Sequence, residues 1–185
     1  MRKLIFGINI TLDGCCDHMK AKGYEDVHEY FGELMTEVDT LVYGRKTYDL
    51  MVPFWPDIAR NHVGPETSMS KFAKAFDKIE KIVVFSQTMG PVDNSKTLVL
   101  NGDLNDEILR LKKEDGGDML LGGVDVPSQL ITLDLIDEYC FVVQPILAGE
   151  GRRLLDGINP FEQLELNLVS SRIFSSGCVA LRYIK

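Results

Sequence analysis

The sequence has 185 residues, the length of one domain, and a domain of that length buries about 70% of the surface of its unfolded chain. Its 45% hydrophobic and 26% charged residues are typical of a folded protein, and its formal net charge of −8 argues against nucleic acid as the main partner, because an acidic surface repels phosphate backbones. No apolar stretch approaches the roughly 20 residues that a membrane span needs, so we expect no membrane association.

Strands and helices alternate through the first part of the chain. Apolar residues at helical spacing predict one helix, while short apolar runs predict strands. Pro53 and Pro56 predict a loop after the second helix. The predicted elements are a strand at Lys3–Thr11, a helix with the face Val27, Phe31, Leu34 and Val38, a strand at Thr40–Tyr43, helices at Lys46–Met51 and Ser70–Phe76, and strands at Lys81–Ser86 and Thr97–Leu100.

The rest of the chain continues the alternation and then changes pattern. Asp103 is a predicted N-cap for a helix that ends before Gly116, a strand follows at Asp118–Leu121, and Pro127 opens another helix. After the long strand in "EYCFVVQPIL", two alternating runs flank a turn at Ser176–Gly177. We predict an α/β fold with a mixed, mostly parallel sheet, helices on both faces and a C-terminal antiparallel hairpin. Ligands of such sheets bind at the carboxyl ends of the strands.

Two strand ends share a pattern in which an apolar strand reaches glycine just before a helix. They are "LVYGRKT" around Gly44 and "MLLGGVD" around Gly122 and Gly123. Glycine allows close approach of a ligand to the backbone, and the first N–H groups of a helix lack partners within it. Arg45 and Lys46 add charge and Thr47 adds a hydroxyl donor. Either loop alone is more often a plain turn, but two on one sheet predict a bound dinucleotide.

These loops do not match the standard phosphate-binding motifs. A P-loop needs a glycine where Asp39 stands, and no GxGxxG follows the first strand. The four cysteines show neither CxxC nor metal-site spacing, and Cys16, Asp17 and His18 are too crowded in one loop to chelate an ion together. We therefore expect no metal and a cytoplasmic protein with reduced thiols.

Polar side chains near the first strand are candidates for catalysis. Asp13 and His18 follow this strand and His28 lies in the next helix, and any of the three could supply a proton. Asp13 is the first candidate for hydrogen bonding to the substrate, and His18 or His28 is the better candidate for delivering a proton at neutral pH. Asp13 is equally typical of a turn, and each histidine of a surface position. Trp55 is expected either to wall an aromatic substrate or to anchor its loop on the core. The predicted substrate contacts are Asn9, Thr11, Asp17 and Trp55.

The order of several motifs resembles the dihydrofolate reductase-like family. The similarity is strongest to the C-terminal reductase domain of the bifunctional riboflavin-biosynthesis deaminase/reductase and its stand-alone relatives. It is carried by "TLDG", "GRKTYDLM", "FWP", "KIVVFSQT", "LLGG" and "LIDEYCFVVQPILAGEGRRLL". The resemblance implies one domain over residues 1–185, a three-layer α/β/α sandwich and the cofactor NADPH. The zinc deaminase motif of the bifunctional enzymes is absent from the sequence.

The resemblance also implies a role for each cofactor loop. Gly44, Arg45, Lys46 and Thr47 would hold the phosphates of the adenosine half, Ser86 and Gln87 would lie by the 2′-phosphate and adenine, and Gly122, Gly123 and Val124 would wrap the pyrophosphate. Many relatives have Arg or Lys where Gln87 stands, which leaves the choice of NADPH over NADH to Arg45 and Lys46. Asp125 lies so near the pyrophosphate loop that we expect its carboxylate to point away.

The resemblance implies hydride transfer from NADPH to a small heterocyclic or ribosylamino-pyrimidine substrate, as in the reductase step of riboflavin biosynthesis. Two alternatives stay open at this point. One is a reductase acting on dihydrofolate or another pterin, although His28 stands about where that enzyme carries an acid. The other is a non-catalytic NADPH-binding sensor. A homodimer is expected by analogy with the riboflavin-type relatives.

Overall fold

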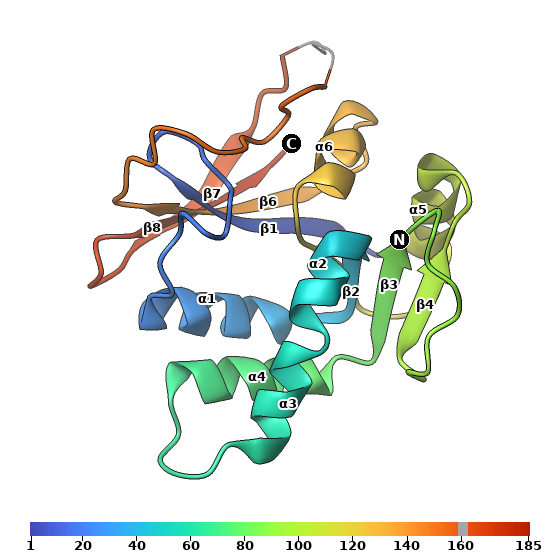
Figure 1. Cartoon of the computed structure of the whole chain (residues 1–185). Helices are drawn as coiled ribbons and strands as arrows, with labels where there is room; N and C mark the ends of the chain where they lie inside the picture. The colour runs from blue at the N-terminus through green and yellow to red at the C-terminus, as the bar shows by residue number, and fades with distance from the viewer. Residues whose placement is uncertain (159–162) are drawn as a thin grey trace.

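An eight-stranded mixed sheet runs through the computed structural model, which describes residues 1–158 and 163–185 (Figure 1). The strand order is β4-β3-β2-β5-β1-β6-β8-β7. The strands are β1 (Leu4–Thr11), β2 (Val38–Gly44), β3 (Lys81–Phe85), β4 (Thr97–Leu100), β5 (Asp118–Leu121), β6 (Glu138–Gln144), β7 (Asn167–Ile173) and β8 (Val179–Ile184). The helices are α1 (Glu25–Met35), α2 (Arg45–Met51), α3 (Phe54–Asn61), α4 (Ser68–Lys78), α5 (Leu104–Lys113) and α6 (Asp125–Thr132).

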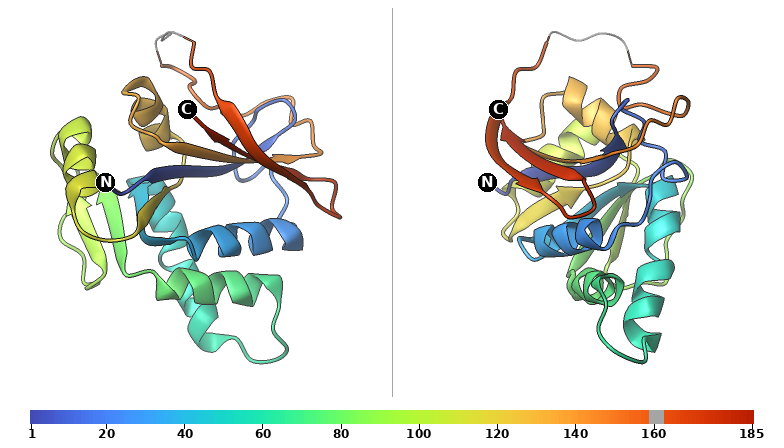
Figure 2. Two further views of the ribbon diagram at one scale, coloured as in Figure 1. Left: turned by 180° about the vertical axis from the view of Figure 1, so that it is seen from behind. Right: turned by 90° about the vertical axis from the view of Figure 1, so that its left-hand side faces the viewer.

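The strand pairing confirms the predicted sheet. The six strands β4, β3, β2, β5, β1 and β6 are parallel neighbours, while β8 is antiparallel to both β6 and β7. Helices cover both faces: α1 and α4 lie on one side, and α5 and α6 lie on the other (Figures 1 and 2). The predicted fold class, a mixed sheet between two helical layers with a C-terminal antiparallel hairpin, is therefore correct.

Alternate residues of the central strand β1 build the two halves of the core. Leu4 and Phe6 are completely buried in the cluster that also holds the apolar residues of α5 and α6. Ile5 points to the opposite face, into the cluster formed with α1 and α4. A strand buried on both faces is rich in apolar residues without strict alternation, as in "LIFGINI", and this is typical of a parallel sheet.

Two predicted elements were wrong in detail. Val38 continues the helical spacing of α1, but the helix ends at Met35 and Val38 begins β2. The predicted loop around Pro53 and Pro56 is instead the start of α3, with Pro53 at the N-cap. Pro56 lies in the first turn, where a backbone N–H would have had no helical partner, so proline does not interrupt the helix.

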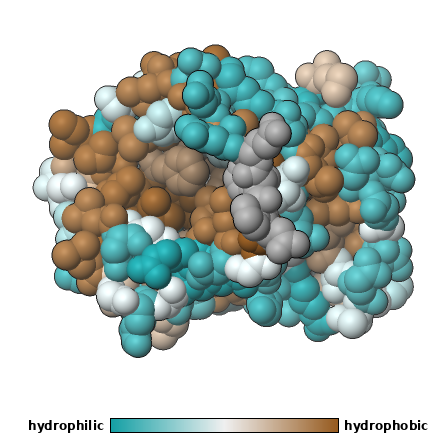
Figure 3. All heavy atoms as spheres, turned by 90° about the horizontal axis from the view of Figure 1, so that it is seen from above, coloured by the Kyte–Doolittle hydropathy of each residue, from teal (hydrophilic) through white to brown (hydrophobic). Residues whose placement is uncertain are grey.

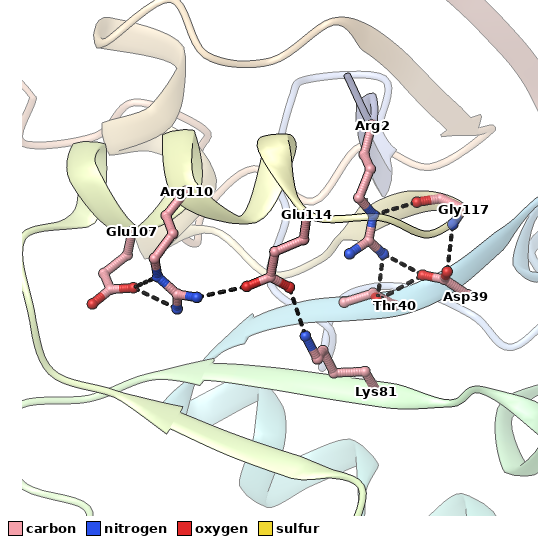
Figure 4. A network of polar contacts seen from close by, with 8 residues as sticks. All are labelled: Arg2, Asp39, Thr40, Lys81, Glu107, Arg110, Glu114 and Gly117. Atoms are coloured by element: carbon pink, nitrogen blue, oxygen red, sulfur yellow. Dashed lines mark hydrogen bonds and ion pairs between the residues drawn. The ribbon is translucent and has the colours of Figure 1, made fainter.

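At the amino end of the strands, Arg2 fastens the start of β1 to its surroundings (Figure 4). Only 6% of Arg2 is exposed, and its guanidinium donates to the Gly117 carbonyl, the Asp39 carboxylate and, over 2.7 Å, the Thr40 hydroxyl. Asp39 in turn accepts a hydrogen bond from the Gly117 N–H. This network joins the amino ends of β1, β2 and β5.

Within the described part of the chain, no helix is long and apolar enough to cross a bilayer.

Candidate active site

A cavity of about 840 Å³ opens at the carboxyl ends of β1, β2 and β5. This is the edge at which open α/β sheets bind ligands. One part of its wall is backbone, supplied by the loops that contain Gly44 and Gly122. Another part is apolar and includes Phe31, Trp55 and Phe72 from α1, α3 and α4. The cavity thus combines a polar backbone wall with an aromatic one.

The two predicted glycine loops lie in contact with each other. The Gly122 N–H donates to the Val42 carbonyl over 3.1 Å, and a Cβ added to Gly122 would lie 2.7 Å from Tyr43 Cε1. Gly123 has a φ of +94°, and a Cβ there would overlap the Thr47 hydroxyl oxygen. Neither glycine can therefore be replaced by a residue with a side chain unless the Tyr43 ring or the Thr47 side chain moves. The residues from Gly44 to Thr47 and from Gly122 to Val124 form one cradle, which we call the two-loop cradle.

The cations of the cradle are paired with acids. Arg45 Nε lies 3.1 Å from Asp49 Oδ2, one helical turn further along α2. Lys46 Nζ lies 3.7 Å from Asp125 Oδ2, and Arg152 also pairs with Asp125. Asp125 does not point away from the cavity, as we had expected, but lines it. Three cations thus face two carboxylates, which leaves an excess of one positive charge at the cradle.

Asp13 has a structural role that argues against the predicted proton donor. Its carboxylate accepts hydrogen bonds from the N–H groups of Ala148 and Gly149 over 3.0 and 2.8 Å, and from the Thr11 hydroxyl. The Thr11 hydroxyl beside it and the two backbone N–H groups hold the pKa of the carboxyl well below its usual range, so it carries no proton to donate near neutral pH. Asp13 and Thr11 do not line the cavity.

Three other predicted polar residues do line it, namely Asp17, His18 and His28. The His18 side chain is 65% exposed, and its Nδ1 lies 3.8 Å from Asp17 Oδ1. His28 is half-buried between Trp55 and Phe72, whose ring centroids each lie 5.8 Å from its own. Burial lowers the pKa of His28 below its ordinary value, so the neutral imidazole predominates at pH 7.

Trp55 and Asn9 are also part of the wall. Trp55 is 8% exposed, its N–H donates to Met51 Sδ over 3.3 Å, and its ring packs 4.4 Å from that of Phe72. Trp55 therefore anchors α3 on the core, which was one of the two expected roles, and it also lines the cavity where a substrate ring could lie, which was the other. Asn9 Oδ1 accepts a hydrogen bond from the buried Gln144 side chain over 3.2 Å.

The amino-acid sequence matches the family model described as the RibD C-terminal domain over residues 2–180. The chain belongs to the RibD C-terminal domain family. It is 31% identical over 189 residues to the uncharacterized protein YyaP of Bacillus subtilis (strain 168), a match that covers 98% of this chain and 94% of YyaP. The resemblance inferred from the motifs is thereby confirmed.

Two solved structures of lower identity share the fold of this RibD-type domain. The diaminohydroxyphosphoribosylaminopyrimidine deaminase/5-amino-6-(5-phosphoribosylamino)uracil reductase of Thermotoga maritima matches with a TM-score of 0.64 at 16% identity, over 99% of this chain and 56% of that protein. Dihydrofolate reductase from Enterococcus faecalis, complexed with NADP(H), also has a TM-score of 0.64, at 15% identity, over 98% of this chain and 95% of that protein. The dihydrofolate reductase-like architecture is correct for this family member.

Ser86 and Gln87 do not line the cavity of this RibD-type domain. Gly44 pairs with Phe85 in the sheet, so Ser86 lies immediately beyond the cradle. The Gln87 amide donates to the Asn101 carbonyl over 3.0 Å, and Ser86 Oγ accepts a hydrogen bond from the Met89 N–H over 3.1 Å. Their place beside the adenosine half of a cofactor stays a prediction.

Arg152 lies in a segment that follows β6 and lines the cavity, although the sequence predicted no role for it in this RibD-type chain. Its carbonyl accepts a hydrogen bond from the Cys16 N–H over 2.8 Å, and its Nε is buried without a hydrogen-bond partner among the described residues. One signal was available in the sequence. Asp125 follows a glycine pair that is expected to bind anions, so a cation near its carboxylate would favour anion binding there. Arg152 follows another strand end at the same edge of the sheet and is a candidate for that cation.

Proposed function

We propose that the protein is an NADPH-dependent reductase of the riboflavin-biosynthesis type, acting on a ribosylamino-pyrimidine or a similar small heterocycle. The observation that carries the proposal is the two-loop cradle at the mouth of a cavity with aromatic walls. Membership of the RibD C-terminal domain family supports the reductase class. The NADP(H) of the structurally similar dihydrofolate reductase supports the cofactor.

The residues of the cradle fit a dinucleotide. Gly122 and Gly123 let the two loops pack directly against each other, because a Cβ at either position would overlap Tyr43 or Thr47. The backbone there could lie against a pyrophosphate, since Val124 is the N-cap of α6 and the first N–H groups of a helix have no partner within it. Arg45 and Lys46 supply the charge for phosphates. When bound, NADPH would supply the hydride for reduction of a C=N or C=O group.

The chain's own residues would orient the substrate and exclude water. Trp55 and Phe72 provide flat apolar surfaces for a heterocyclic ring, and Asn9 provides an amide held in place by Gln144. His18 and His28 are the candidates for delivering a proton. His18 is open to solvent, whereas burial keeps His28 mostly neutral.

Titration with NADPH tests this function. Trp55 is the single tryptophan and lines the cavity, so its fluorescence should be quenched as the cradle fills. We then expect the near-ultraviolet absorbance of the reduced nicotinamide to fall when the ribosylamino-pyrimidine substrate is added. Lack of quenching and of a thermal shift at millimolar NADPH would contradict cofactor binding. Binding without oxidation of NADPH by pyrimidine or pterin substrates would favour a sensor instead.

Arg45→Ala should weaken NADPH binding about 10- to 100-fold, because one charge-assisted hydrogen bond to a phosphate contributes about 1.5–3 kcal/mol. NADH binding should change much less, since NADH lacks the 2′-phosphate. Arg60→Ala is the matched control: Arg60 is also an exposed arginine, but it lies on α3 outside the cavity wall. An equal loss for NADPH and NADH would mean that Arg45 does not recognise the 2′-phosphate.

A further inference from the structure

Aromatic side chains from three helices form one part of the cavity wall, separate from the two-loop cradle. His28 and Phe31 come from α1, Trp55 from α3 and Phe72 from α4. The ring centroids of Trp55 and Phe72 lie 4.4 Å apart, and that of His28 lies 5.8 Å from each. Phe31 follows His28 by three residues, so the two side chains are neighbours on one side of α1. We call these four residues the aromatic end.

The surroundings of the aromatic end are apolar as well. Met51 Sδ accepts the Trp55 N–H over 3.3 Å, and Leu50, the residue before it, lines the cavity and is 48% exposed. Within the described residues, no acidic, lysine or arginine side chain of α1, α3 or α4 lines the cavity. Burial lowers the pKa of His28, so its imidazole adds no charge at pH 7. The charged residues of the wall come instead from α2, α6 and the loops after the strands.

The positive charge of the cavity wall is too small to hold both NADPH and a second phosphate. The cradle has an excess of one positive charge, as counted above. Lys22 and Asp17, on the loop between β1 and α1, balance each other in charge. NADPH would bring about four negative charges, two on its pyrophosphate and about two on its 2′-phosphate. The filled cavity would then have an excess of about three negative charges and would repel a further anion.

We infer that the substrate is a flat, uncharged heterocycle that enters the aromatic end and carries no phosphate. The inference rests on the proposed reductase function and narrows the substrate class of the same site. A flat ring stacks favourably on Trp55 and Phe72. A phosphate placed among these side chains would lose its hydration without gaining a partner, which costs more free energy than the apolar contacts return.

The polar groups near the aromatic end suit a neutral ring. Asn9 Oδ1 accepts a hydrogen bond from Gln144, which leaves the Asn9 amide N–H groups to donate to a ring carbonyl or ring nitrogen. Reduction would add a hydride from NADPH to the carbon of a C=N or C=O group and a proton from solvent to its nitrogen or oxygen. One π bond is lost and NADP⁺ is released, so no charged group on the substrate is needed for the reaction.

The test uses two compounds that differ only in one phosphate, 5-amino-6-(ribosylamino)uracil and its 5′-phosphate. Isothermal titration calorimetry measures the binding of each to the full chain saturated with NADP⁺, which cannot reduce them. We expect the phosphate-free compound to bind at least about 10-fold more tightly. With NADPH, its kcat/KM should be higher by a similar factor. Raising the salt concentration should reduce the difference, because salt screens the repulsion between anions.

Leu50→Lys should remove the discrimination, because it adds a cation beside the aromatic end. The phosphorylated compound should bind this variant at least about 10-fold more tightly than the wild type, with little change for the phosphate-free one. Leu50 is half-exposed, so we expect the variant to fold, as circular dichroism can verify. Met69→Lys is the matched control: Met69 is 42% exposed on α4 and does not line the cavity, so both affinities should stay unchanged.

Apolar side chains also gather on the face of the molecule seen from above (Figure 3), and a ring bound there would be unaffected by Leu50→Lys. Equal affinities of the phosphorylated compound for the wild type and for folded Leu50→Lys would therefore overturn the inference. It is also overturned if NADP⁺-saturated protein binds the phosphorylated compound as tightly as the phosphate-free one, or binds neither at millimolar concentration. Quenching of Trp55 fluorescence by NADPH would persist in these cases, whereas its loss would mean that the proposed function itself has failed.

Discussion

Gly123→Ala should weaken NADPH binding at least about 100-fold and lower the free energy of unfolding by about 1–3 kcal/mol. The φ of Gly123, +94°, is strained for any other residue, and the new Cβ would displace the Thr47 hydroxyl from its place in the two-loop cradle. Thr47 would then have to move away from the groups that would hold the phosphates. Quenching of Trp55 fluorescence measures the affinity, and urea denaturation measures the stability.

Gly149→Ala is the control that separates the two effects of Gly123→Ala, the loss of stability through backbone strain and the loss of NADPH affinity. Gly149 also has a positive φ, +74°, but a Cβ there meets no atom within 4 Å, and Gly149 does not line the cavity. We expect Gly149→Ala to lower stability by about 1 kcal/mol through strain alone, with an unchanged NADPH affinity. If Gly123→Ala binds NADPH as well as Gly149→Ala does, the cofactor does not occupy the two-loop cradle.

Arg2→Ala should lower the free energy of unfolding by about 3–5 kcal/mol, the usual cost of removing one partner from a buried ion pair. The Arg2 side chain is 4% exposed, and its loss leaves the Asp39 carboxylate, 26% exposed, without its cation. The Gly117 carbonyl and the Thr40 hydroxyl lose their donor as well. Urea denaturation followed by far-ultraviolet circular dichroism measures the change.

Arg110→Ala is the control for this prediction. Arg110 pairs with Glu107 and Glu114 in the same region, but its side chain is 50% exposed (Figure 4). Pairs of this kind contribute about 0–1 kcal/mol because water screens them. Comparable losses of stability in Arg2→Ala and Arg110→Ala would show that burial does not distinguish the two arginines.

The parts of the fold that were predicted well are those with clear local boundaries. β4 and β5 have the predicted limits, Thr97–Leu100 and Asp118–Leu121, and Asp103 caps α5 by accepting a hydrogen bond from the Asp106 N–H over 3.1 Å. Two elements were predicted wrongly, because proline does not always interrupt a helix and because apolar spacing can continue past the end of one. Proline in the first turn of α3 costs no hydrogen bond, and the spacing of Val38 continues the period of α1 by coincidence.

The candidate site was predictable only where its chemistry is local. Each half of the two-loop cradle is a contiguous motif, so both halves could be found in the sequence. The pairing of Arg152 with Asp125 joins residues from two separate loops, and only the folded sheet brings them together. The hydrogen bonds of Asp13 could not be predicted, because its position after β1 does not reveal that its carboxylate faces the N–H groups of Ala148 and Gly149.

The central position of β1 has a consequence for how the protein folds. β1 pairs with β5 and β6, as in the pairs Leu4–Met119 and Ile5–Glu138, so its partners are synthesised more than a hundred residues after it. Contacts of such long sequence separation slow folding and leave apolar surface exposed in the interim. The carboxyl ends of β1 and β5 meet only at this late step, so ligand binding should emerge together with the closure of the sheet during folding.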